Sequence, residues 1–268
     1  MAGINVRDDI LQYFDTEVRK RLGILASEYR REFDGKVRRT IGPVPSVSHN
    51  WIDHFDLTAD EVVGAIDQQI AAYQEVGHAF RWKVYSHDRP EELAPALLGR
   101  GFQLWEECTL MILDVNTFEP NRPEGIGFRQ LTDPETMPQE WRPVQSQVWD
   151  EGSDDFNAAI QAEMRDMGES MAIFIAQRNN SNIGTGLVRY TECRTFGGLF
   201  AGATIPSARG QGVYRGMVSI RVEHARKIGA AYLYTEAGSM SRPILEKIGF
   251  RPLSMITNYA FHDSAIRP

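Results

Sequence analysis

The segment from Phe200 to Arg215, which reads F-A-G-A-T-I-P-S-A-R-G-Q-G-V-Y-R, constrains this chain more than any other stretch. An apolar run ends at Ile205-Pro206, a short turn carries two glycines, and an amphipathic pattern begins at once. This order predicts a strand, a turn and a helix N-terminus. The first backbone N–H groups of a helix have no intrahelical partner, and the helix dipole favours negative charge there. The segment therefore predicts a cradle for an anionic ligand.

The spacing of the turn narrows the identity of that ligand. Gly210 and Gly212 let a phosphate approach the backbone, and Arg209 and Arg215 can supply charge-assisted hydrogen bonds. A dinucleotide-binding fingerprint would need glycine where Arg215 stands, because the third glycine is one position late. The Gly-Lys-Ser/Thr of a P-loop does not occur. The turn thus indicates a ligand that contains a pyrophosphate but is bound neither by a dinucleotide fingerprint nor by a P-loop.

The arrangement R-x-x-G-x, placed directly after a strand that ends in A-T-x-P, resembles the acetyl-CoA-binding segment of the GNAT superfamily of N-acetyltransferases. The match runs from Arg209 through Gly212 and departs at Tyr214, where the family more often has Gly or Ala. A second segment, Ile244–Phe250 (I-L-E-K-I-G-F), resembles the L-Y-E-K-L-G-F that closes the last helix of many members. The resemblance covers roughly residues 126–261 and implies acetyl-CoA as the co-substrate.

Composition bounds the remaining possibilities. With 268 residues, 42% hydrophobic and 24% charged, the chain has the make-up of a soluble globular protein with one large or two modest cores. We expect no membrane span and no signal peptide, and the two cysteines imply neither a disulfide framework nor a zinc site. The formal net charge of −7 argues against nucleic-acid binding. A cytoplasmic protein without a metal is the simplest expectation.

Periodicity along the chain predicts its organisation. Apolar residues at spacings of three and four predict one helix from Ile10 to Phe33, and the capping box Thr58–Glu61 predicts another helix after it. Residues 116–125 contain two prolines and acidic residues and read as a linker. After the linker the predicted order is β-α-α-β-β-β-α-β-α-β, with the cofactor helix at Gly212–Ile228. This is the order of the GNAT fold.

The first half of the chain shows a weaker resemblance to the same order of elements. Leu97–Phe102 (L-L-G-R-G-F), followed by a strand at Leu110–Asp114, resembles the closing helix and last strands of a second GNAT unit. No glycine-bearing turn with a neighbouring arginine precedes it. The predicted fold class is therefore α/β: two tandem GNAT-like domains with a central mixed β-sheet flanked by helices. Residues 1–118 form the degenerate domain and residues 119–268 the acetyl-CoA-binding domain; an unrelated helical extension at the N-terminus is the alternative.

The resemblance implies a set of cofactor contacts. Backbone N–H groups at the end of the strand should hold the pantetheine arm and the thioester carbonyl oxygen. The pyrophosphate should lie against the turn and the first residues of the helix. The predicted cofactor-binding residues are Ala203, Thr204, Ile205, Arg209, Gly210, Gln211, Gly212, Val213, Tyr214 and Arg215.

Two positions depart from the family pattern. Where members often have the Tyr that protonates the leaving thiolate, this chain has Leu245, and where they often have an Asn, it has Gly238. Leucine cannot donate a proton, so the usual general acid is absent. Ser241 has a hydroxyl in the same segment, although it also suits the N-cap of a helix that begins at Arg242. Departures at these positions make cofactor binding a firmer expectation than catalysis.

Transfer to an amine also needs a base, because the attacking nitrogen must be neutral. Glu236, at the end of a predicted strand, is the first candidate. Glu151, in the acidic loop between two predicted helices, is the second. Each is equally explained as a solvated surface carboxylate. The acidic loop itself would suit a cationic amine.

The sequence thus predicts an acetyl-CoA-dependent N-acetyltransferase that acts by direct attack on a primary amine of a small molecule or peptide. Two alternatives stay open. One is a transferase of a longer acyl group, and the other is a non-catalytic acyl-CoA-binding sensor. The chain is expected to be a monomer or homodimer.

Overall fold

A computed structural model describes residues 6–21, 26–149 and 153–262 of the chain. All of its strands lie in one 11-stranded sheet, in the order β1-β2-β3-β4-β11-β5-β10-β9-β8-β7-β6. The strands are β1 (Arg30–Phe33), β2 (Val37–Ile41), β3 (Trp51–Phe55), β4 (Phe80–Tyr85), β5 (Gln103–Asp114), β6 (Gly127–Leu131), β7 (Met171–Arg178), β8 (Ser181–Tyr190), β9 (Phe196–Thr204), β10 (Tyr232–Ala237) and β11 (Arg251–Phe261).

The α-helices are α1 (Val6–Phe14), α2 (Val62–Glu75), α3 (Leu93–Gly99), α4 (Met137–Glu140), α5 (Arg142–Gln145), α6 (Ser153–Met167), α7 (Val213–Ile228) and α8 (Arg242–Ile248). A π-helical turn, η1 (Asp15–Lys20), continues α1. Short 3-10 turns are η2 (Val115–Thr117), η3 (Pro134–Thr136), η4 (Gly168–Ser170) and η5 (Pro206–Ala208).

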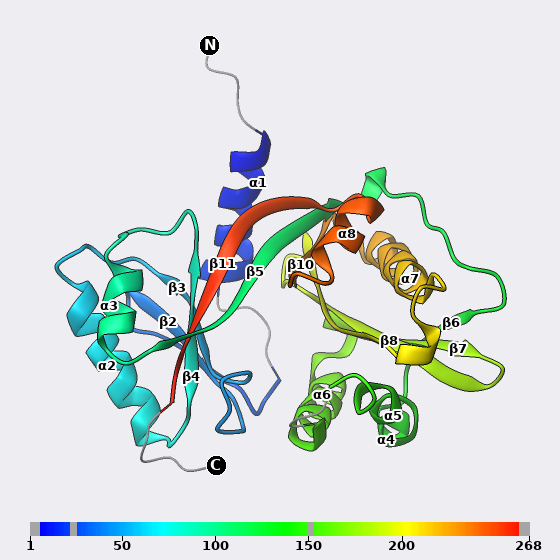
Figure 1. Ribbon diagram of the computed structural model, residues 1–268, viewed down its shortest axis with the longest axis horizontal. Coiled ribbons are helices and arrows are strands. Elements are labelled where there is room, and N and C mark those ends of the chain that lie inside the picture. The colour runs from blue at the N-terminus through cyan, green and yellow to red at the C-terminus, as the bar shows by residue number, and fades with distance from the viewer. Residues whose placement is uncertain (1–5, 22–25, 150–152, 263–268) are drawn as a thin grey trace.

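Two halves of the molecule repeat the same plan. The series β1-β2-β3-α2-β4-α3-β5 recurs in the second half as β7-β8-β9-α7-β10-α8-β11. The last strand of each series crosses into the other half (Figure 1): β5 pairs with β10 at Thr109–Asp114, and β11 pairs with β4 at Ile256–Phe261. The two exchanged strands are antiparallel to each other and form the middle of the sheet.

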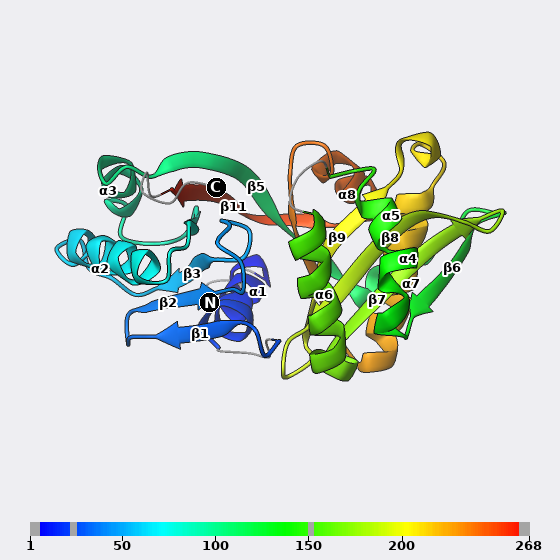
Figure 2. The same cartoon turned by 90° about the horizontal axis from the view of Figure 1, so that it is seen from below.

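Alternation along the strands divides the core into layers. In the second half, α7 and α8 pack on one face of the sheet and α4–α6 cover the other (Figures 1 and 2). On β7, for example, Phe174 faces α7, whereas Ile173 and Ile175 face the α4–α6 layer. In the first half, α2 and α3 cover a separate core that contains the fully buried Trp82 of β4.

The N-terminal prediction is wrong beyond Lys20. Instead of one helix from Ile10 to Phe33, the chain has a helix that ends at η1 and a strand at Arg30–Phe33. Asp34 and Gly35 make the turn into β2, and the Asp34 carboxylate accepts hydrogen bonds from the N–H groups of the residues two and three positions on. The Asp-Gly pair was the signal of a hairpin. The apolar spacing suggested a helix, but in the structure the backbone of β1 is hydrogen-bonded to β2.

The second half follows the prediction. Its order is β-α-α-β-β-β-α-β-α-β apart from short helical turns before α6, and α7 begins at Val213 and ends at Ile228. The predicted fold class is confirmed, including the mixed sheet flanked by helices. The predicted boundary at residue 118 falls between η2 and β6. Strands β5 and β11 both cross into the other half, so the two halves of the structure do not correspond to two separate chain segments. The boundary at residue 118 therefore stays a prediction.

Candidate functional site

Strands β9 and β10 separate at one edge of the sheet. They are parallel, but their pairing is confined to Phe196–Gly198 of β9 and Tyr232–Tyr234 of β10. Beyond this point the hydroxyl of Thr235 donates to the carbonyl of Leu199 at 3.1 Å, and β9 continues to Thr204 beside β8 alone. On the β10 side of β9 the carbonyl of Thr204 accepts from Arg209 Nε at 3.3 Å, whereas the N–H of the same residue is open to another partner.

A bulge in β9 shapes this opening. Ala203 pairs with Thr185 and Phe200 with Leu187, so β9 carries one extra residue, and Ala201 has a φ of +48°. The buried side-chain amide of Gln145, on α5, donates to Thr185 Oγ1 at 2.7 Å and to the carbonyl of Ala201 at 3.0 Å. Helix α5 thereby holds the bulge from the face opposite α7.

The turn after β9 leaves the N-terminus of α7 uncapped. Gly210 and Gly212 have φ values of +73° and +79°, a region that favours glycine, and Gly212 stands at the N-cap without a side-chain hydrogen bond. Arg209 and Arg215 on either side are exposed and have no ion-pair partner within the described part of the chain. Among the described residues, the N–H groups of Gly210–Val213 have no backbone partner and are flanked by two cations, which is an anion-binding arrangement.

The other predicted cofactor residues have mixed surroundings. The N–H of Ile205 donates to the carbonyl of Ile183 at 3.1 Å, so that group is already used. Because alternate residues of a strand face opposite neighbours, the N–H of Thr204 faces the open side. Ala203 and Val213 are buried. Gln211 is bonded to the side chain of Arg178, and Tyr214, whose pKa burial raises, packs beside Gly202.

Glu236, the first candidate base, lies near the C-terminal end of β10, at the same sheet edge as the turn after β9. Both of its carboxylate oxygens accept from the Lys83 ammonium, at 2.7 and 2.8 Å. The side chains are only 22% and 9% exposed, so the pair is substantially shielded from water. Lys83 belongs to β4, and this ion pair therefore links the two halves across three strand spacings of the sheet.

The remaining predicted catalytic residues are less informative. Glu151 lies outside the described residues. Helix α8 begins at Arg242 as expected, but the Ser241 hydroxyl donates to the carbonyl of Gly238 at 3.3 Å and makes no capping bond to the helix. Ser241 is thus tied to the loop after β10.

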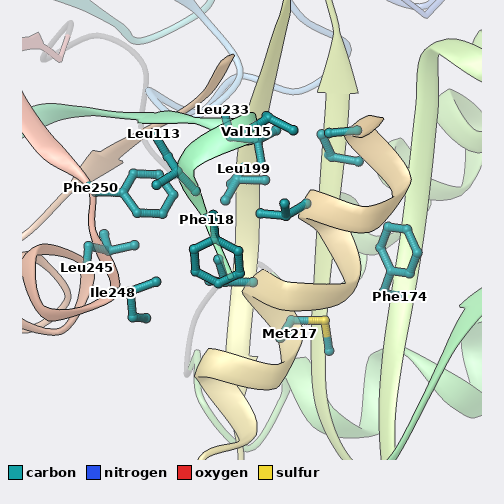
Figure 3. Packing of buried hydrophobic residues seen from close by; sticks show 14 of the residues in the cluster. Leu113, Val115, Phe118, Phe174, Leu199, Met217, Leu233, Leu245, Ile248 and Phe250 are labelled. Carbon is teal, nitrogen blue, oxygen red and sulfur yellow. The ribbon is translucent and has the colours of Figure 1, made fainter. Parts of the chain in front are cut away.

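Leu245, at the position where many GNAT members have Tyr, is a core residue. It is 1% exposed and packs with Ile248 and Phe250 against Leu113 of the exchanged strand β5 (Figure 3). Burial of a leucine side chain contributes about 1.5–3 kcal/mol to stability. The side chain at this position therefore stabilises the junction of α8 with β5.

Sequence reasoning missed the polar residues that the exchanged strands bring to Glu236. Lys83 pairs across β4 and β11 with Asn258, and Asn258 pairs with Glu106 of β5, so the three side chains share one face of the sheet. Glu106 Oε1 lies 4.0 Å from the point where a Cβ on Gly238 would be. The alternation of polar with apolar residues in β4 could have indicated that Lys83 lies on one face of a strand. It could not have indicated that Glu236 is the partner of Lys83.

The pKa of the Cys108 thiol is affected by the charged groups on this face. Burial raises the pKa of its thiol to about 12, and the nearby Glu236 and Glu106 carboxylates add to the effect. The thiol is therefore protonated at neutral pH. Two carboxylates, one cation and one neutral thiol meet at the end of β10.

Among the residues that the structure describes, no group of three or more His, Cys, Asp and Glu side chains is placed to hold a metal ion. Within the same ranges, every helix is too short or too polar to cross a bilayer.

Comparisons with known proteins identify the architecture. No family model and no curated protein sequence matches the chain. Among solved structures, a GCN5-related N-acetyltransferase from Kribbella flavida is similar with a TM-score of 0.70 and 12% identity over 98% of both chains. One from Sphaerobacter thermophilus has a TM-score of 0.61 at 12% identity, covering 97% of this chain and 86% of that one. A tandem GNAT protein from the clavulanic acid biosynthesis pathway has a TM-score of 0.60 at 13% identity, covering 89% and 84%.

Proposed function

The chain has the tandem GNAT fold, and from this premise we propose that it is an acetyl-CoA-dependent N-acetyltransferase acting on a primary amine. One observation carries the proposal: the open side of β9 runs directly into the uncapped, cation-flanked N-terminus of α7. An extended ligand with a pyrophosphate at one end matches both features. The thioester of acetyl-CoA supplies the activated acyl group.

The residues of this chain would divide the binding as follows. N–H groups at Gly210–Val213, with Arg209 and Arg215, would hold the pyrophosphate. The N–H of Thr204 would bond the pantetheine arm along the open side of β9. The glycines are required because a Cβ and its conformational preference would obstruct the approach of phosphate to the backbone.

The amine would be activated beside the end of β10. Its nitrogen attacks the thioester carbonyl, a C–N bond forms, the C–S bond breaks, and CoA leaves as a thiolate while the amine proton passes to a base. We assign that base to Glu106 in preference to Glu236. Both oxygens of Glu236 are bonded to Lys83, whereas Glu106 is exposed and has no ion pair in the described ranges. Glu236 then positions Lys83.

The test is CoA release from acetyl-CoA, followed with a thiol reagent over a panel of primary amines. We expect release above hydrolysis with at least one amine. Glu106→Gln should lower kcat by roughly 100-fold or more, the usual contribution of a general base. Glu107→Gln is the matched control, because the next residue on a strand points to the opposite face.

Each other outcome has a definite meaning. CoA binding without turnover on any amine would identify a sensor, and turnover with longer acyl-CoA alone would identify a different transferase. A loss of turnover in Glu236→Gln with none in Glu106→Gln would return the base to Glu236. Failure to bind CoA by calorimetry would overturn the proposal.

A further inference from the structure

The face of the sheet that carries Glu106 and Glu236 also carries a set of cations from the first half. Residues two apart on a strand share a face and lie about 7 Å apart. Arg81 therefore stands beside Lys83 on β4, and Arg38 on β2 belongs to the same face. A row of like charges on one face needs counter-charges or a ligand.

Most of these cations have a carboxylate of their own. Arg38 binds Asp53 with Nη2···Oδ1 at 2.8 Å, and Lys83 binds Glu236. Although burial favours the neutral acid, the Arg38 guanidinium keeps the pKa of Asp53 below its usual value. These pairs are internally neutral and leave no charge for a ligand.

Arg81 is the exception. Its guanidinium makes no ion pair and no hydrogen bond within the described residues, and its Nε is buried without any partner. A buried donor without a partner costs about 1–3 kcal/mol, more when it is charged. The side chain is half-buried, so its other nitrogens remain reachable from solvent. An anionic ligand would satisfy this group.

A bulge in β5 places an aromatic ring against the same guanidinium. Asn258 pairs with Glu106 and Tyr259 with Leu104, which makes Trp105 the extra residue of the strand. The guanidinium carbon of Arg81 lies 5.0 Å from the Trp105 ring centroid. The ring is 40% exposed. This cation–π contact holds the guanidinium beside the ring, and its N–H groups can still donate to an anion.

On the side of α6, Arg81 is accompanied by the Tyr29 and His49 rings and by the charges of Asp155, Glu163 and Arg189, of which Glu163 is paired with Arg189. The Tyr29 hydroxyl is 2.7 Å from Nδ1 of His49, and the His49 ring is 6.3 Å from that of Phe156 on α6. Burial, followed by the charge of Arg81, lowers the pKa of His49 to about 4, so the ring is neutral at pH 7. Within the described residues, neither Asp155 nor another carboxylate on this side forms an ion pair with Arg81.

We propose that Arg81 and Trp105 form an anion subsite, and that the amine acceptor of this protein carries a carboxylate or phosphate group. The proposal rests on the proposed function, because it places the reacting amine at Glu106. Trp105 precedes Glu106 directly in the chain, so the two subsites are neighbours. A separation of about one strand repeat fits an acceptor whose amine and anion are joined by several bonds.

The experiment uses matched amines on the full chain. Pentylamine offers the amine alone, 5-aminopentanoate adds a carboxylate, 5-aminopentyl phosphate adds a phosphate, and 1,5-diaminopentane adds a second cation. We expect a lower KM for one or both anionic amines than for pentylamine. The better of the two identifies which anion the subsite takes.

Arg81→Ala should raise the KM for the preferred anionic amine by roughly 10- to 100-fold, the value of a charge-assisted hydrogen bond, and change the KM for pentylamine by a smaller factor. Arg81→Lys should restore part of the loss, and Trp105→Leu should give a smaller increase. Arg100→Ala is the control, since that exposed arginine pairs with Asp67 on the helix side of the same half. Thermal unfolding would verify that each variant is folded.

Three results would overturn the subsite. They are equal KM values for pentylamine and both anionic amines, a preference for 1,5-diaminopentane, or an equal loss with every amine in Arg81→Ala. If no amine is acetylated, the proposed function fails by itself. Calorimetric binding of 5-aminopentanoate and 5-aminopentyl phosphate against pentylamine, in wild type and Arg81→Ala, would then decide the subsite without turnover.

Discussion

The two halves of this protein share a strand–helix plan but differ at the junction where α2 and α7 begin. At α7 the N-terminus is uncapped and flanked by Arg209 and Arg215. At α2 the chain supplies its own anion: the Glu61 carboxylate accepts from the Thr58 N–H at 3.0 Å and is also paired with Lys36. The hydrogen bond from Lys36, followed by those from the backbone and side chain of Thr58, lowers the pKa of Glu61 to about 2.

The openings beside the strands that precede α2 and α7 also differ. The parallel pairing of β3 with β4 stops at Ile52, just as that of β9 with β10 stops early. In the first half Arg19 fills the opening: its Nε donates to the carbonyl of Asp53 at 2.7 Å, and its guanidinium lies 3.9 Å over the Tyr85 ring. In the second half the corresponding contact comes from the exposed Arg209, whose Nε donates to the carbonyl of Thr204 at 3.3 Å. One scaffold thus has an opening filled by a buried arginine and an opening bordered by an exposed one.

Comparing the two halves separates the features that maintain the fold from those that can bind a ligand. Both halves keep the sheet, the helices and the exchanged last strand. Only the second half combines a glycine turn with exposed arginines at the start of its helix, whereas the first half has the Glu61 carboxylate before α2 and Arg19 bonded to the carbonyl of Asp53. The first-half opening contributes to stability, and we expect the second-half opening to contribute to binding.

The largest effect should follow from removing Arg19. Arg19→Met deletes ion pairs of 2.9 Å with Asp15 and with Asp88, and leaves these shielded carboxylates without their cation. We expect a loss of about 3–5 kcal/mol in the free energy of unfolding. Chemical denaturation measures it.

Acetyl-CoA affinity should be unchanged in Arg19→Met, with one site per chain. Arg21→Met is the matched control, because that side chain is 53% exposed and its pair with Glu17 should contribute less than about 1 kcal/mol. A second equivalent of CoA bound by Arg19→Met would mean that Arg19 alone blocks a working site. Equal stabilities of the two variants would contradict the structural role of Arg19.

The next largest effect should follow from giving α7 the acidic start of α2. Gly212→Asp and Gly212→Asn both accept a positive φ better than most residues, and they differ only in charge. We expect the Asp variant to weaken CoA binding by about 100-fold and the Asn variant by less than about tenfold, because the carboxylate occupies the anion site. Calorimetry compares them. Similar losses in both would show that crowding against Pro123, not charge, governs the site.

The smallest effect concerns two buried histidines of the first half. Burial and neighbouring cations lower the pKa of His49 and of His54 to about 4. Between pH 6.5 and 4 the unfolded chain binds protons that the folded chain does not, so stability must fall as the pH falls through this window. We expect a loss of roughly 1–3 kcal/mol per histidine, seen as a lower melting temperature at pH 4.5 than at pH 7.

His54→Gln should flatten this pH dependence, while CoA affinity should follow the same pH profile as in the wild type. The variant separates the histidine effect from carboxylate titration, which begins at lower pH. An unchanged pH dependence in both His49→Gln and His54→Gln would show that the two rings are protonated in the folded protein.

Local patterns were sufficient for the second half. The glycine turn predicted the start of α7 within one residue, and the I-L-E-K-I-G-F segment predicted α8 and the strand after it. They failed at residues 30–33, where helical spacing coincided with a hairpin. Spacing of apolar residues describes one face of an element, and it cannot tell which neighbour will satisfy the backbone.

The fold class, the order of elements in the second half and the glycine turn can be read from the sequence, since each depends on residues close together in the chain. The surroundings of Glu236 depend on contacts between distant segments. Lys83 reaches it from 153 positions away, and Glu106 reaches the same edge on a strand exchanged between the halves. Strand pairing is set by long-range hydrogen bonds and shared burial, which no local pattern records.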